Sequence, residues 1–170
     1  MTTSNPAPAA PVTEIYSDRI IKNLTLKAPR SRVWRALSDY KEFGTWFHTE
    51  LDGPFVEGNE LTGSCGCSEE YANIRFNMKV ERVRPEGELA FRWHPFPVDP
   101  AIDYSLEPRT LVEFTLRETT LDGRAATQLT IVESGFDKLP PERREIAFRM
   151  NNGGWDEQGD NIMAYVDANP

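Results

Sequence analysis

Long apolar runs are missing from this sequence, and their absence excludes a helix that crosses a bilayer. The N-terminal stretch MTTSNPAPAAPVTE has neither a basic start nor an apolar segment, so no secretory signal is expected. Cysteine is scarce as well: the two cysteines, Cys65 and Cys67, stand one residue apart, which is too close for an easy disulfide. We therefore expect a soluble, cytoplasmic protein in a reducing compartment, without membrane insertion.

Basic residues are outnumbered by acidic ones, 19 against 27, which leaves a formal net charge of -8. Such a protein repels nucleic-acid phosphates, so we expect no nucleic-acid partner. Zinc normally needs two separated ligand pairs, and the cysteine pair has only a distant His48 to join it, so we expect no metal. The sequence shows no glycine-rich phosphate loop, no G-x-S-x-G elbow and no H-E-x-x-H helix. It therefore indicates no cofactor and no catalytic residue, and it leaves open whether the protein is an enzyme.

The composition fits one globular domain, with 39% apolar and 11% aromatic residues in a chain of 170. A chain of this length can bury a sizeable core, or a core with a cavity. Residues 1–17 are rich in Pro, Ala, Ser and Thr and have little to bury, so we expect a disordered tail there. The domain itself is predicted to span residues 18–170.

Alternating apolar residues predict a series of neighbouring antiparallel strands. The clearest is NIRFNMKVERV, in which Ile74, Phe76, Met78 and Val80 alternate with polar residues, as in a sheet that is solvated on one face. The stretch HPFPVDPAIDYSLEP contains four prolines and is predicted to be a loop. Further strands are predicted over residues 20–28, 60–65 and 88–93, with a long hairpin over 109–134 that turns at Asp122-Gly123.

Helical spacing predicts two short helices over residues 29–37 and 39–47, the second with Asp39 as its N-cap. The chain from about residue 145 to Asp167 is predicted to form one long helix. Gly153 and Gly154 cost this helix about 1 kcal/mol each relative to alanine. They either kink the helix or remove side chains where something must come close.

A concave wall is expected from the inward residues of the strands, roofed by the long helix. Either these side chains fill the interior as a core, or they line a cavity that holds a ligand. The predicted ligand-binding residues are Phe76, Met78, Phe91, Trp93, Val112, Phe114, Leu129, Ile131, Glu133, Met150, Gly154 and Trp155.

Glu133 continues the alternation of Leu129 and Ile131, so its carboxyl group is expected to point inward. A buried carboxylate needs a partner or stays protonated. An ion pair with an arginine would make Glu133 structural, whereas an unpaired carboxyl group would suit ligand binding or acid/base chemistry. Other polar candidates for the wall are His94, Tyr104 and Gln158, with Arg75 or Asn77 if the strand register differs.

The order of elements, together with three local phrases, resembles the START-like (SRPBCC, helix-grip) superfamily. The phrases are APRSRVWRALSDYKEFGTWF near the start, and VESGFDKLP followed by NNGGWDEQGDNIMAYV near the end. They are most similar to the branch of the activator of heat-shock protein 90 ATPase. The resemblance covers about residues 18–167 and implies an α+β helix-grip fold, in which a curved antiparallel sheet wraps around a long C-terminal helix and two short helices follow strand 1.

This resemblance implies a cavity beneath the helix, and three functions stay open. The first is non-catalytic binding of a hydrophobic small molecule. The second is a cyclase or hydrolase, similar to the polyketide cyclase relatives, with Glu133 or His94 as acid/base. The third is a chaperone-associated role in the stress response, although the extra N-terminal domain of the eukaryotic activator is not found in this sequence. A homodimer is a further expectation.

Overall fold

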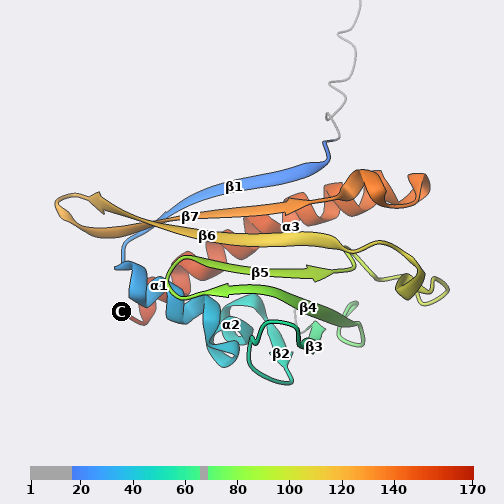
Figure 1. Ribbon diagram of the computed structural model, residues 1–170, viewed down its shortest axis with the longest axis horizontal. Coiled ribbons are helices and arrows are strands. Elements are labelled where there is room, and N and C mark those ends of the chain that lie inside the picture. The colour runs from blue at the N-terminus through green and yellow to red at the C-terminus, as the bar shows by residue number, and fades with distance from the viewer. Residues whose placement is uncertain (1–16, 66–68) are drawn as a thin grey trace, which may run out of the picture.

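The structure is a computed structural model that describes residues 17–65 and 69–170. Within these residues a seven-stranded antiparallel sheet has the order β1-β7-β6-β5-β4-β3-β2, and the long helix α3 crosses one face of it (Figure 1). The expected tail over residues 1–17 and the motif ending at Cys67 lie mostly outside the described residues. The elements are β1 (Arg19–Leu26), α1 (Arg30–Ser38), α2 (Tyr40–Phe47), β2 (Thr49–Leu51), β3 (Glu60–Cys65), β4 (Arg75–Arg84), β5 (Glu88–Trp93), β6 (Thr110–Leu121), β7 (Arg124–Ser134) and α3 (Pro141–Ala168).

The two short helices follow from local capping and one close approach. Asp39 accepts hydrogen bonds from the backbone N–H groups of Lys41 and Glu42, which satisfies two free donors at the start of α2. Gly44 lies inside this helix, and a Cβ at this position would stand 2.5 Å from the backbone oxygen of Thr49, so the close approach of the two segments requires glycine. α2 can therefore pack directly against β2, a three-residue strand that the sequence pattern did not predict.

Tight turns set the register of the sheet. Asp122 and Gly123 both have positive φ, 51° and 72°, as a two-residue hairpin between β6 and β7 requires. Between β4 and β5 the register shifts at Val80 and Arg82, so a bulge breaks the simple alternation there. Lys22, the polar exception on the inner side of β1, pairs with Asp156 of α3 at 2.7 Å. The helix-grip α+β fold expected from the sequence is confirmed.

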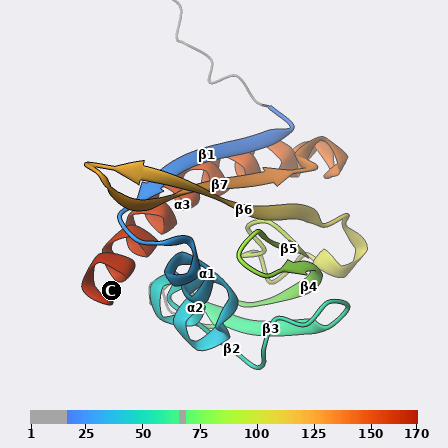
Figure 2. The same cartoon turned by 60° about the vertical axis from the view of Figure 1, so that its left-hand side comes forward.

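The sheet curves around α3 and around the pair of short helices, and the core lies between these layers (Figure 2). Phe43 of α2 sits near its centre, fully buried, with its ring 5.2 Å from Phe55 and 6.3 Å from Phe114 between centroids. The buried aromatic residues of α2 thus face the core. α3 runs as one continuous helix through Gly153 and Gly154.

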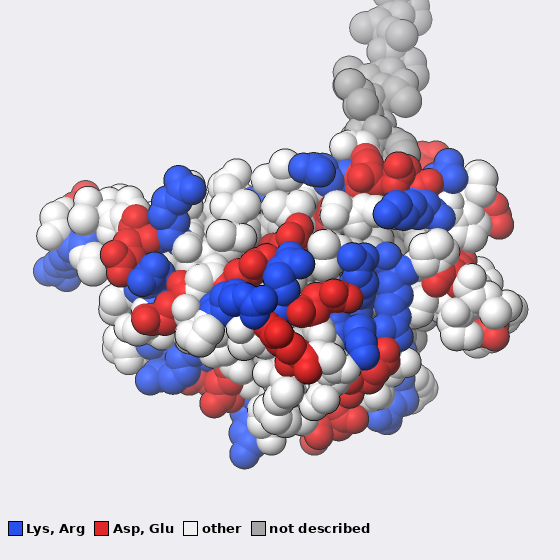
Figure 3. Space-filling model, viewed as in Figure 1, with Lys and Arg blue, Asp and Glu red and all other residues white. Residues whose placement is uncertain are grey.

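The outer face of the sheet is covered with paired charges (Figure 3). Arg82 bridges Glu88 at 2.8 Å and Glu113 at 2.7 Å, and so connects three strands. Among the described residues, no helix combines the length and apolarity that a bilayer crossing requires. The sheet therefore separates a charged outer face from an aromatic inner one.

Candidate functional site

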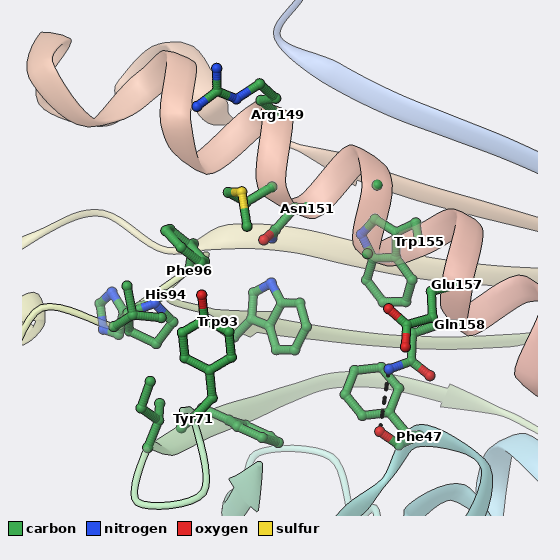
Figure 4. A pocket seen from close by; sticks show the side chains of 17 residues that line it. Phe47, Tyr71, Trp93, His94, Phe96, Arg149, Asn151, Trp155, Glu157 and Gln158 are labelled. Atoms are coloured by element: carbon green, nitrogen blue, oxygen red, sulfur yellow. Dashed lines mark hydrogen bonds between the residues drawn. The ribbon is translucent and has the colours of Figure 1, made fainter. Parts of the chain in front are cut away.

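A pocket of about 430 Å³ opens between the middle of α3 and the chain beside the start of β4 and the end of β5 (Figure 4). Aromatic and aliphatic side chains form most of its wall. α3 contributes one side, and the proline-rich loop after β5 contributes another. The lining residues are Phe47, Tyr71, Ile74, Phe76, Trp93, His94, Phe96, Pro97, Val98, Arg149, Met150, Asn151, Gly153, Gly154, Trp155, Glu157 and Gln158.

Two consecutive glycines hollow the helical side of this pocket. Gly153 and Gly154 both line it, and a Cβ built on either would meet no atom within 4 Å outside its own helical neighbourhood. α3 is continuous there and open space lies beside both glycines, so of the two explanations for these glycines the removal of side chains fits the structure. Their cost in helix propensity coincides with open space at the pocket.

Glu133 of β7 lies fully buried directly behind the pocket wall. Its Oε1 accepts hydrogen bonds from Trp93 Nε1 at 2.8 Å and Thr110 Oγ1 at 2.7 Å, and its Oε2 accepts one from Trp155 Nε1 at 2.6 Å. Asn151 Nδ2 lies 3.0 Å from both oxygens. Neutral donors thus satisfy this carboxyl group. The ion pair with an arginine, which was one of the two possibilities left open by the sequence, is not formed among the described residues.

Burial raises the pKa of Glu133 above its ordinary value, while the hydrogen bonds from Thr110, Trp155, Trp93 and Asn151 lower it. Three of these four partners contact Glu133 through N–H groups, which can only donate, so they orient the carboxyl oxygens and are oriented by them. Trp93, Asn151 and Trp155 all line the pocket, whereas Glu133 does not. Its role in the described geometry is to hold three wall residues in place.

The proline-rich loop is fastened to the start of α3 by one buried arginine. Arg143 pairs with Glu107 at 3.1 Å and donates to the backbone oxygens of Pro95 at 2.7 Å and Phe96 at 3.0 Å. Its guanidinium also stands 4.6 Å from the ring centroid of Tyr104. Phe96, with its positive φ of 47°, is thereby held at the pocket wall.

His94 stands where this pocket meets a smaller one of about 170 Å³. Its Nε2 accepts a hydrogen bond from Arg109 Nε at 3.4 Å, and its buried Nδ1 has no partner. Burial, with the nearby charge of Arg109, lowers the pKa of His94. Around the smaller pocket lie Arg75, Asn77 and Tyr104, which the sequence had suggested as polar wall residues, and Arg109, which it had not.

The structure brings five of the predicted ligand-binding residues to the pocket and places the others beneath it. Trp93 and Trp155 are in contact, with ring centroids 5.8 Å apart, so aromatic side chains fill the interior between sheet and helix at that point. The pocket lies to one side of this filled interior. At its wall are Phe76, Trp93, Met150, Gly154 and Trp155; in the core are Met78, Phe91, Val112, Phe114, Leu129 and Ile131, with Glu133 behind the wall.

Several wall residues were not expected from the sequence, because they lie in loops without a periodic pattern. Tyr71 precedes β4, and Phe96, Pro97 and Val98 follow β5. An aromatic residue among prolines was the one available signal, since exposed loops seldom carry such side chains without a packing role. Gln158, a polar candidate from the sequence, does line the pocket and donates to the backbone oxygen of Phe47 at 3.3 Å.

Within residues 17–65 and 69–170, no group of three or more His, Cys, Asp or Glu side chains could hold a metal ion. The question of metal binding by Cys65 and Cys67 falls outside the described residues, because the side chain of Cys65 is not described either. The described part of the site is an aromatic pocket with few polar groups and no such ligand group.

A curved antiparallel sheet that grips a C-terminal helix, with a pocket beside that helix, defines a protein of the helix-grip class. The family model described as "Activator of Hsp90 ATPase homolog 1-like protein" matches residues 27–167, and the chain belongs to this family. A search of curated proteins finds no match.

Solved structures agree on the fold. Protein MLL2253 from Mesorhizobium loti is similar at 22% identity and a TM-score of 0.68, over 89% of this chain and 98% of that one. DynU16, from the dynemicin biosynthetic locus, is 24% identical with a TM-score of 0.64, over 89% of this chain and 48% of DynU16. The Aha1 dimer from Colwellia psychrerythraea is 15% identical with a TM-score of 0.60, over 88% of this chain and 94% of that one.

Proposed function

We propose that this protein binds a hydrophobic small molecule in the pocket beside α3 and does not transform it. The observation that carries the proposal is the pair Gly153-Gly154, which leaves open space on the face of α3 that borders the pocket of about 430 Å³. Pockets of this size, with apolar walls and few polar groups, are typical small-molecule sites. The similarity to DynU16, a protein of a biosynthetic locus, is compatible with a metabolite of that kind.

The position of Glu133 favours binding without catalysis, because it removes one of the two acid/base candidates of a cyclase or hydrolase. A catalytic acid or base must come within hydrogen-bond reach of its substrate. The Glu133 oxygens are instead occupied by Trp93, Thr110, Asn151 and Trp155, and they lie behind the wall. In the proposed binding protein, the Glu133 carboxyl group holds residues of the pocket wall in position.

The direct test is a thermal-shift screen with neutral aromatic and apolar metabolites. A ligand at one hundred times its Kd should stabilise the wild-type protein by about 2.7 kcal/mol. Gly154→Phe should abolish the shift, because the new ring would occupy the open space beside the helix. Gly154→Ala is the matched control and should keep it, because a methyl group meets no neighbour there.

A folded Gly154→Phe protein that binds with wild-type affinity would contradict the proposed site. Should that variant fail to fold, Met150→Trp offers a second way to narrow the pocket. Met150 is 38% exposed and lines the same space, so this change adds volume without entering the core. Wild-type affinity in the folded Met150→Trp protein would contradict the proposal equally.

A further inference from the structure

The two charged side chains that line the pocket, Glu157 and Arg149, point in different directions. Glu157 lines the mouth of the pocket, and its exposed carboxylate has no ion pair or hydrogen bond with any described residue. Figure 4 shows its carboxylate on the same side of α3 as Trp155 and Gln158. Arg149 is the lining residue with a permanent positive charge, and its guanidinium points away from the aromatic side chains in the same view. The carboxylate is therefore the charge that an occupant of the pocket would meet.

The remaining basic group in the wall adds no positive charge at neutral pH. Burial and the nearby Arg109 lower the pKa of His94, which keeps its imidazole neutral. Arg109 itself forms a two-fold ion pair with Glu60, at 2.8 Å and 3.2 Å, so its charge is largely offset. The whole chain carries a formal net charge of -8, which favours the approach of cations.

Aromatic rings surround the same space from several elements. Tyr71, Phe76, Trp93 and Phe96 are half-buried and border the pocket, and Figure 4 shows the hydroxyl of Tyr71 directed across it toward α3. The Phe76 ring lies 5.9 Å from Trp93, and the Tyr71 ring 6.4 Å from Phe96, between centroids. Rings gathered in this way attract organic cations through the negative potential of their faces.

Glu133 strengthens this effect from behind. Its oxygens accept hydrogen bonds from both indole N–H groups, at 2.8 Å from Trp93 and 2.6 Å from Trp155. A hydrogen bond donated to a carboxyl group polarises the donor, which shifts electron density toward the indole rings. Two of the pocket's largest rings are thereby made better partners for a positive charge.

We propose that the ligand of this pocket is an apolar organic cation, such as an ammonium compound that carries aromatic or alkyl groups. The inference rests on the proposed binding function and names the class of ligand. The apolar part would occupy the space beside Gly153 and Gly154, and the cationic part would lie against the aromatic rings of the wall. A neutral ligand would leave the exposed carboxylate of Glu157 to interact with solvent alone.

The experiment compares phenyltrimethylammonium with tert-butylbenzene, its neutral isostere of nearly equal shape. Each is titrated into the full chain, and binding is followed by intrinsic tryptophan fluorescence, because Trp93 and Trp155 lie at the wall. The cation should bind about tenfold more tightly than the hydrocarbon, a difference of about 1.4 kcal/mol. Equal affinities, or tighter binding of the hydrocarbon, overturn the inference but leave the proposed function intact. Failure of both probes to bind counts against the proposed function itself.

Variants then separate charge from shape. Glu157→Gln should reduce the advantage of the cation about threefold and leave the affinity for tert-butylbenzene unchanged. Glu145→Gln removes the same charge from an exposed site on α3 outside the pocket, so it is the matched control and should change neither. Tyr71→Leu should weaken the cation selectively. An unchanged preference in both Glu157→Gln and Tyr71→Leu overturns the inference.

Discussion

Replacement of Glu133 by glutamine should destabilise the fold, although it removes a buried charge. Two effects oppose each other: relief of the desolvation that raises the pKa of Glu133, and loss of acceptor oxygens for buried donors. Glutamine keeps one oxygen and introduces an NH₂ group that cannot accept. If the glutamine oxygen faces Trp93 and Thr110, its nitrogen faces Trp155 Nε1. In the wild-type protein this Nε1 lies 2.6 Å from an acceptor, Oε2 of Glu133. In the opposite orientation of the glutamine amide, Trp93 Nε1 is the group left without an acceptor.

The size of the effect follows from this geometry. One buried N–H without a partner costs about 1–3 kcal/mol, and the remaining bonds lose their charge assistance, so we expect about 3 kcal/mol in total. For a chain of this length that loss lowers Tm by roughly 6–12 °C. Urea unfolding gives the same free energy directly. A protonated glutamic acid escapes this penalty, because its hydroxyl oxygen can still accept a hydrogen bond.

Glu113→Gln is the matched control, one strand away on the outer face. Its carboxylate pairs with Arg82 at 2.7 Å and is 29% exposed, so its loss should cost less than 1 kcal/mol. A Glu133→Gln protein as stable as wild type, or more stable, would show that desolvation outweighs the hydrogen bonds and would refute the reasoning.

Three further predictions concern pH, the helix and the loop. Because the pKa of Glu133 is raised in the folded protein, the native state keeps this proton to a higher pH than the unfolded chain does. Protonation of Glu133 therefore contributes to stability; the contribution is complete below about pH 4.5 and is lost as pH rises through the folded pKa. Urea unfolding across pH should show that decline in wild type relative to Glu133→Gln, and parallel curves would contradict it. Gly154→Ala should raise the free energy of unfolding by up to about 1 kcal/mol, since its methyl group meets open space; a loss of stability in urea would contradict this. Arg143→Met strands the buried carboxylate of Glu107 and should cost about 3–5 kcal/mol, with faster amide hydrogen exchange in residues 94–109; unchanged exchange in that loop would count against the clamp.

Much of the fold could be predicted from the sequence, because strands and helices leave periodic patterns. The alternation from Phe76 to Val80 identified β4, and Asp122-Gly123 identified the longest hairpin. Where a local close contact decides the structure, no pattern exists. β2 depends on the approach of Thr49 to Gly44, and the bulge at Val80 depends on pairing with β5.

The site could be predicted only in part. The two glycines and the inward direction of Glu133 follow from helix propensity and strand alternation, and both are seen. The partners of Glu133 could not be deduced, because Trp93, Thr110, Asn151 and Trp155 come together only in three dimensions. The same periodicity marks core and wall residues alike, and for this reason Met78 and Phe76 could not be told apart.

The bonds from Asn151 and Trp155 to one carboxyl group also fix how far along the sheet α3 can sit. These two residues are four apart, one turn of the helix, so a slip by a turn would break all of their bonds at once. The part of the pocket wall that α3 contributes is therefore set in place when the protein folds, before any ligand arrives.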